Sequence, residues 1–210
     1  MEIICHRINN HKQLESISKN FGAEIDVRYH QNKLVLHHDP FNHHKDRSIS
    51  TLEEFLEAWE RSSTLILNIK SEGIEQKCIE LLEKYKIQRW FFLDLSMPYF
   101  VKYAEYIAEK KYKSFTRKNL AVRFSDKECF EYANNFFKNA GWIWIDYFED
   151  HPLNLKNYKM IKNSNVKICL VSPELHGRDK ADAYDLALNI KKSFEIDAVC
   201  TKYPEIWMIK

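Results

Sequence analysis

Short apolar runs alternate with amphipathic segments along the whole chain. The runs are rich in Ile, Val, Leu and Trp, which is typical of strands buried in a parallel sheet. We therefore expect strands at 2–5, 24–27, 65–69, 90–93, 120–122, 142–145, 166–171 and 198–200, with one further extended piece at 33–36.

The segments between these strands carry apolar residues at helical spacing. Capping-box patterns at Ser50–Glu54 and Ser125–Glu128 predict the starts of two helices, which run to about Trp59 and Asn139. The spacing predicts further helices at 11–21, 74–85, 99–108, 153–162 and 180–193. We expect loops at 40–47 and 110–119, where the chain is polar and irregular.

Strands that alternate with helices predict an α/β fold, here a single compact (β/α)8 barrel of the TIM type. A length of 210 residues fits one domain over residues 1–210, and it requires short helices in such a barrel. A doubly wound open sheet is the alternative. The barrel is favoured because nearly every predicted strand ends in a polar residue, whereas an open sheet concentrates its site at a switch point.

Composition narrows the class of protein. Hydrophobic residues make up 45% of the chain and charged residues 30%, as expected for a soluble globular protein. The net charge of +2 is too small to indicate nucleic-acid binding, and we expect none. No apolar run reaches the length of a membrane span. We expect no signal peptide, because the predicted first strand already begins at Glu2.

Cysteine usage bears on the compartment. The cysteines show neither CxxC pairing nor zinc-ligand spacing, so we expect buried, reduced thiols. Reduced thiols indicate a cytoplasmic protein. The five cysteines are Cys5, Cys78, Cys129, Cys169 and Cys200.

Charged side chains gather at the ends of the first predicted strands. Glu24 and Asp26 stand two residues apart in a strand, so alternation places both carboxylates on one face. Paired carboxylates suit one hard divalent cation, Mg²⁺ or Ca²⁺. Neighbouring strand ends supply imidazole, basic and amide side chains, namely His6, Arg7, His38, Asn68 and Lys70.

These residue types together suit phosphodiester cleavage. Lysine and arginine hold phosphate oxygens, and two histidines on separate strands can accept and donate protons near neutral pH. A cation and basic side chains stabilise the charge that develops at phosphorus. The chain has four glycines and no Gly-rich loop, which excludes P-loop and dinucleotide-binding motifs.

The order of these motifs resembles the glycerophosphodiester phosphodiesterases, β/α barrels of the phospholipase-C-like phosphodiesterase group. The family's His-Arg-Gly, Glu-x-Asp, His-Asp and Glu-x-Lys correspond to His6-Arg7, Glu24-Ile-Asp26, His38-Asp39-Pro40 and Asn68-Ile-Lys70. Later pieces resemble a small bacterial subgroup: Phe92–Pro98, Trp144–Asp146, Val171–His176 and Cys200–Pro204.

The resemblance implies roles for the matching residues. His6 and His38 would be the acid/base pair; Arg7 and Lys70 would bind phosphate; Glu24, Asp26 and Asn68 would hold the cation. The chain departs from the family pattern at two positions, because Ile8 replaces the glycine and Asn68 replaces the third carboxylate. An amide oxygen brings no charge, so the affinity for the cation should fall.

Residues near later strand ends are further candidates. Arg123, Glu174 and His176 would bind substrate, with an ion pair of Glu174 or His176 to Arg178 as the alternative. Asp94 and Asp146 are expected to support the site or the fold rather than bind the cation. A one-residue slip in the short strand at 33–36 would exchange His38 for His37.

Two classes of function remain open. The first is a metal-dependent hydrolase that cleaves a small glycerophosphodiester-like substrate. The second, motivated by Ile8 and Asn68, is a barrel that binds a phosphorylated ligand without turnover. The related sphingomyelinase D branch adds a third outcome, a lyase that releases a cyclic phosphate. The alcohol group and the oligomeric state stay open.

Overall fold

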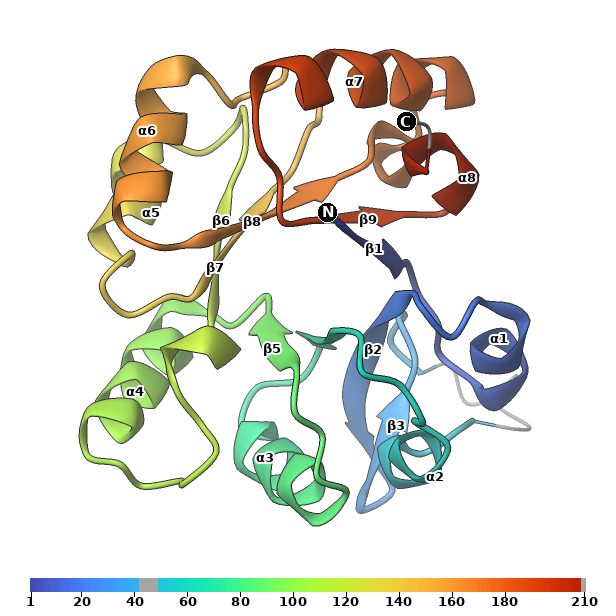
Figure 1. The fold of residues 1–210 in the computed structure, drawn as a ribbon. Helices are drawn as coiled ribbons and strands as arrows, with labels where there is room; N and C mark the ends of the chain where they lie inside the picture. The colour runs from blue at the N-terminus through green and yellow to red at the C-terminus, as the bar shows by residue number, and fades with distance from the viewer. Residues whose placement is uncertain (42–48, 209–210) are drawn as a thin grey trace. The chain divides into compact units, whose positions relative to one another are not determined.

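The structure is a computed structural model that describes residues 1–41 and 49–208 (Figure 1). The loop expected at 40–47 therefore lies largely outside the described residues. The chain divides into two compact units by its internal contacts. Unit 1 comprises Met1–His6 and Arg117–Lys210, and unit 2 comprises Arg7–Thr116.

Unit 2 contains three parallel strands in the order β2-β4-β5, and β3 extends them as an antiparallel neighbour of β2. Its strands are β2 (Gly22–His30), β3 (Lys33–Leu36), β4 (Leu65–Ile69) and β5 (Trp90–Leu93). Its helices are α1 (His11–Ser16), α2 (Leu52–Glu57), α3 (Glu75–Lys84) and α4 (Met97–Ala108).

Local signals explain most boundaries of unit 2. Gln31 and Asn32 both have positive φ, at 46° and 63°, as a tight hairpin turn requires. That turn lets β2 run on to meet β3, so the strand is longer than expected. Thr51 and Glu54 form the predicted capping box at the start of α2. Helix α1 ends at Ser16, earlier than predicted, because Ile17 is already extended.

Unit 1 contains five parallel strands in the order β6-β7-β8-β9-β1. They are β1 (Glu2–Cys5), β6 (Ala121–Phe124), β7 (Trp142–Ile145), β8 (Lys167–Val171) and β9 (Ala198–Thr201). The helices are α5 (Phe130–Asn135), α6 (Leu155–Asn163), α7 (Lys180–Ser193) and α8 (Pro204–Trp207), with 3₁₀ turns η1 (Arg117–Asn119) and η2 (Pro173–His176).

The predicted capping box at Ser125–Glu128 is wrong. Helix α5 begins only at Phe130. The Ser125 hydroxyl donates to the Glu128 carboxylate at 2.9 Å and accepts the Lys127 amide at 3.1 Å, which closes a separate turn. Ser125 and Glu128 have the residue types and the spacing of a capping box, but here they stabilise a turn that precedes the helix.

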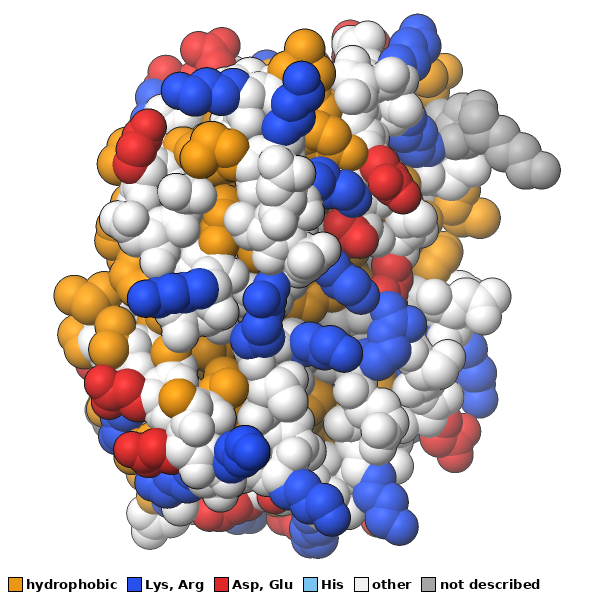
Figure 2. All heavy atoms as spheres, turned by 60° about the vertical axis from the view of Figure 1, so that its left-hand side comes forward, with side chains coloured by type: hydrophobic (Ala, Val, Ile, Leu, Met, Phe, Trp, Pro, Cys, Tyr) orange, Lys and Arg blue, Asp and Glu red, His pale blue; other side chains and the backbone are white. Residues whose placement is uncertain are grey.

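The apolar strands form the core of each unit, as expected. Most of their side chains are buried, and buried Trp142 and Trp144 of β7 share a face in unit 1. On the surface in view, Figure 2 shows basic side chains gathered across the middle, with acidic ones beside them and towards the edges. Among the described helices, none has both the length and the apolar character needed to cross a membrane.

Cysteine burial leads to a first testable prediction. None of the five cysteines is in a disulfide, and all but Cys129 are buried, so the expectation of five buried thiols is wrong at Cys129. Burial also raises the pKa of the Cys78 thiol, which keeps it protonated and unreactive. One thiol should therefore react quickly with a disulfide reagent in the native protein, and five should react after denaturation without reductant.

The variant Cys129→Ser provides the control for this titration. It should remove the rapid phase and leave four thiols in the denatured chain. Two or more rapidly reacting thiols in the unaltered native protein would contradict the burial pattern, and fewer than five after denaturation would indicate a native disulfide.

Candidate functional site

Two buried carboxylates from β2 form the centre of a polar cluster in unit 2. Glu24 and Asp26 are 1% and 0% exposed. The parallel pairing of β2 with β4 sets Asp26 opposite Asn68, so the amide reaches the same face. The Glu24 carboxylate accepts hydrogen bonds from the Asn68 side-chain amide at 2.9 Å and from the Arg7 backbone N–H at 2.8 Å.

The environment of Glu24 disfavours its charged form. Burial, and then the nearby Asp26 carboxylate, raise the pKa of Glu24 from 4.5 to about 7. The hydrogen bonds from Arg7 and Asn68 and the charge of Lys70 act in the opposite direction but do not offset burial. A buried acid with a pKa near neutrality is characteristic of functional sites.

Two oxygens beside Glu24 accept no hydrogen bond. Within the described residues, both Asp26 Oδ1 and Asn68 Oδ1 are buried and have no donor. Buried acceptors are rarely left in this state. Carboxylate and amide oxygens are the ligands that Mg²⁺ and Ca²⁺ prefer, so the donor set fits the expected cation. No cluster of three or more His, Cys, Asp or Glu with metal-binding geometry occurs in the described part, because the third donor here is an amide.

Two basic side chains flank the carboxylates. Arg7 Nε lies 4.0 Å from Asp26 Oδ2 and is nearly half exposed at 45%. Lys70 Nζ lies 3.7 Å from Asp26 Oδ1 and 3.4 Å from Asp94 Oδ2. Arg7 has a φ of 54°, a conformation uncommon for arginine. That conformation presents its backbone N–H to Glu24, and the strain is of the kind found at functional sites.

The hydrogen bonds of His38 define its tautomer. Its Nδ1 lies 2.7 Å from Asp39 Oδ1, and its Nε2 lies 2.5 Å from Arg7 Nη2. The hydrogen bond with His38 lowers the pKa of Asp39, so this carboxylate is ionised and accepts from Nδ1–H. A guanidinium can only donate, so Nε2 carries the lone pair. In this tautomer Nε2 is the ring atom that can take up a proton.

His37 makes different contacts from His38. Its ring stacks on Phe41 with centroids 5.0 Å apart, and its Nδ1 bonds the Asp39 carbonyl. The structure brings His38, and not His37, to Arg7.

Two further residues support this cluster and were not predicted. Asn9 makes a reciprocal pair with Asp26: its amide donates to Oδ2 and its oxygen accepts the Asp26 N–H, both at 2.8 Å. Arg28 donates to the carbonyls of His38 and Lys70. Arg28 could have been found, because it continues the alternation of Glu24 and Asp26 along β2. Asn9 carried no such signal, since its contact depends on the path of the chain after β1.

Unit 1 holds a second polar cluster around Asp146, which follows β7. Its carboxylate accepts from Trp144 Nε1 at 3.1 Å, lies 3.0 Å from His176 Nε2 and lies 3.4 Å from Arg123 Nε. Arg123 lies within β6 rather than after it. Asp146 therefore holds two predicted substrate-binding residues, Arg123 and His176, in one group.

Glu174 and His6 complete the predicted residues of unit 1. Glu174 is buried, and its Oε1 accepts from the Thr201 hydroxyl at 2.6 Å and from the Lys202 N–H at 2.8 Å. His6 follows β1, and its backbone N–H donates to the Thr201 carbonyl. The alternative partner Arg178 pairs with Asp182 at 3.1 Å.

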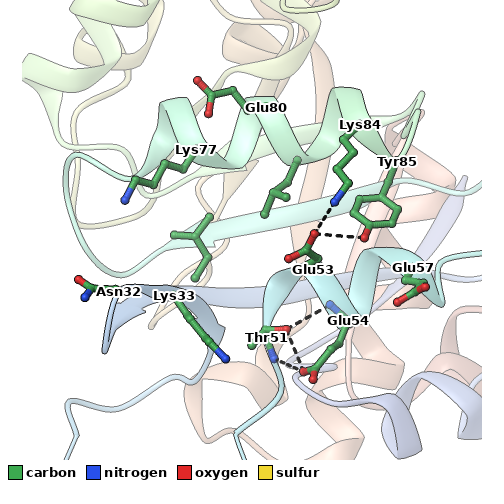
Figure 3. Close-up of a pocket in the computed structure, with 12 residues that line it drawn as sticks. Asn32, Lys33, Thr51, Glu53, Glu54, Glu57, Lys77, Glu80, Lys84 and Tyr85 are labelled. Atoms are coloured by element: carbon green, nitrogen blue, oxygen red, sulfur yellow. Dashed lines mark hydrogen bonds and ion pairs between the residues drawn. The ribbon is translucent and has the colours of Figure 1, made fainter.

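A cavity of about 740 Å³ in unit 2 contains none of these residues. It lies between α2, α3 and the start of β3, and Figure 3 shows its charged lining, including the ion pair of Glu53 and Lys84. Four glutamates and three lysines line it, so it carries little net charge. The polar cluster at the strand ends, rather than this cavity, carries the candidate chemistry.

Comparisons with known proteins bear on the fold. No protein-family model and no curated protein sequence matches the chain. Among solved structures, it is similar to a glycerophosphodiester phosphodiesterase from Agrobacterium tumefaciens, with a TM-score of 0.69, 12% identity and 98% of both chains covered. It is also similar to a glycerophosphoryl diester phosphodiesterase from Parabacteroides distasonis, with a TM-score of 0.64, 13% identity, and 96% of this chain and 82% of that chain covered.

These similarities decide between the two architectures considered from the sequence. The expected TIM-type barrel is confirmed, and the doubly wound sheet is not the fold. The resemblance noted in the sequence motifs thus extends to the three-dimensional structure: the chain has the barrel fold of two solved glycerophosphodiester phosphodiesterases.

Proposed function

We propose that the chain is a metal-dependent phosphodiester hydrolase whose site is centred on Glu24 and Asp26. The observation that carries the proposal is the pair of buried acceptors without donors, Asp26 Oδ1 and Asn68 Oδ1. They stand beside a carboxylate and two basic side chains. The fold of two phosphodiesterases supports the reaction class.

Each residue of the site has a separate role in the proposed hydrolysis. Glu24, Asp26 and Asn68 would hold one Mg²⁺ or Ca²⁺, which neutralises charge on the phosphate when it is bound. Arg7 and Lys70 bind the remaining phosphate oxygens. His38 accepts a proton through Nε2 from the water that attacks phosphorus, and His6 donates a proton to the alkoxide that departs. Arg123, Glu174 and His176 bind the rest of a small glycerophosphodiester-like substrate, in the cytoplasm.

Hydrolysis after metal removal tests this proposal. Protein treated with EDTA should lose activity toward glycerophosphodiesters and bis(p-nitrophenyl) phosphate, and added Mg²⁺ or Ca²⁺ should restore it. Full activity in EDTA would contradict the metal role. Phosphate binding without turnover under any metal would favour the non-catalytic class that Asn68 suggests. A cyclic phosphate detected by ³¹P NMR as the released product would identify a lyase.

A further inference from the structure

Asp94 lies beside Lys70 at the end of β5. Its Oδ2 is 3.4 Å from Lys70 Nζ, close enough for a hydrogen bond. The same ammonium is 3.7 Å from Asp26 Oδ1, which accepts no hydrogen bond within the described residues. One lysine therefore lies between two carboxylates: it forms ion pairs with both, and the hydrogen bond goes to Asp94.

Hydrogen bonds hold the backbone of Lys70, so the position of its ammonium depends on the conformation of its side chain. Lys70 donates its N–H to the Val27 carbonyl and accepts at its own carbonyl from Arg28 Nη1. Asp94 has a φ of 59°, in the left-handed region that Asp and Asn tolerate best among residues other than glycine. This turn directs the chain from β5 towards α4, which begins at Met97.

The alternative position of Lys70 would harm the proposed site in two ways. An ammonium bonded to Asp26 Oδ1 would occupy an oxygen that the cation needs and would cancel its charge. The effect would be large here, because Asn68 leaves only Glu24 and Asp26 as charged ligands. The ammonium would also be withdrawn from the phosphate.

We infer that Asp94 is a positioning residue: it accepts the hydrogen bond of Lys70 and thereby keeps the ammonium from hydrogen bonding to Asp26 Oδ1, which stays open to the cation. The inference rests on the proposed function. It gives Asp94, whose side chain is 25% exposed, a defined role through Lys70.

A double-mutant cycle on cation binding tests the inference. The probe is Mn²⁺ alone, titrated by electron paramagnetic resonance into the unaltered protein, Asp94→Asn, Lys70→Met and the double variant. Asp94→Asn should weaken Mn²⁺ binding about tenfold, which corresponds to about 1.4 kcal/mol. Asn also tolerates the left-handed backbone, so the fold should persist, and thermal unfolding checks this. In the Lys70→Met background, Asp94→Asn should have no further effect, since the competing ammonium is gone.

The variant Glu53→Gln is the matched control. Like Asp94→Asn, it removes one negative charge from unit 2. It also breaks the ion pair between Glu53 Oε1 and Lys84 Nζ, which are 2.5 Å apart in the cavity of Figure 3. Mn²⁺ affinity and turnover should not change in this control. Kinetics provide a second readout, because Asp94→Asn at saturating Mn²⁺ should raise KM for the diester through the displaced lysine more than it lowers kcat.

The outcomes separate this inference from the proposed function. Equal weakening by Asp94→Asn in both backgrounds would show that Asp94 acts through its own charge, and would overturn the inference. Unchanged Mn²⁺ affinity in Asp94→Asn would also overturn it, while leaving the proposed function intact. Failure of the unaltered protein to bind Mn²⁺ would overturn both.

Discussion

Replacing Glu24 by glutamine should abolish turnover and raise the thermal stability of the metal-free protein. Glutamine has nearly the same shape and can satisfy the same neighbours. Its oxygen can accept the Arg7 N–H, and its amide can donate to Asn68 Oδ1 after that side chain flips. Activity is lost because one of the two charged ligands of the proposed cation is gone.

The pH dependence of this stabilisation has a definite sign. Burial raises the pKa of Glu24 to about 7 in the folded protein, against 4.5 when unfolded. Below about pH 4.5, Glu24 is protonated in both the folded and the unfolded protein, so its burial does not lower the free energy of unfolding. Between pH 4.5 and 7, the unfolded state releases its proton first, so stability falls as pH rises, and the full cost remains above pH 7.

The expected size follows from the same shift. The cost at pH 8 is on the order of 3 kcal/mol, so Glu24→Gln should raise Tm by roughly 5 °C or more in EDTA. The two proteins should converge near pH 4.5. Added Ca²⁺ should raise the Tm of the unaltered protein and not that of the variant. Differential scanning calorimetry across pH, with and without Ca²⁺, measures all of this.

A second buried carboxylate provides the matched control. Burial also raises the pKa of Glu75 in α3, which is fully buried and has no part in the proposed site. Glu75→Gln should not lower stability at pH 8, and it should keep full activity. Loss of activity in both variants would point to a general disturbance of unit 2, and Glu24→Gln with normal turnover would exclude Glu24 as a ligand.

Strand positions could be predicted from the sequence because each is a short apolar run bounded by turn residues. The predicted strands at 65–69, 90–93 and 142–145 coincide with β4, β5 and β7. Helix α7 was also predicted at its observed bounds. The four-residue helix α8 (Pro204–Trp207) was missed, because it is too short to show a periodic pattern.

Part of the candidate site followed from alternation alone. The spacing of Glu24 and Asp26 placed both on one face of β2, and both lie in the same cluster. Two contacts could not be predicted: the pairing of Asn9 with Asp26, and the position of the Lys70 ammonium between the carboxylates of Asp26 and Asp94. They depend on how loops return to the strand ends, which local patterns do not encode.

Two histidine variants should separate the entering from the leaving proton. The Nδ1–H of His38 donates to Asp39, and the lone pair of its Nε2 faces Arg7. Nε2 is therefore the atom that would accept the proton of the attacking water. His38→Ala should therefore slow kcat by about a hundredfold or more for every diester. His6→Ala should have an effect of that size on a glycerophosphodiester with a poor alkoxide leaving group. It should have a much smaller effect on bis(p-nitrophenyl) phosphate, because p-nitrophenolate departs without a proton.

The neighbouring His37 is the control for the assignment. Its ring stacks on Phe41 and its Nδ1 bonds the Asp39 carbonyl, so His37→Ala should leave turnover within a few-fold of normal. A large loss of turnover in His37→Ala, together with normal turnover in His38→Ala, would show that His37 is the catalytic histidine and that the assignment is shifted by one residue. If the leaving-group dependence belongs to His38 instead of His6, the two roles are exchanged. Equal effects of both variants on both substrates would mean that the two histidines do not act as an acid/base pair.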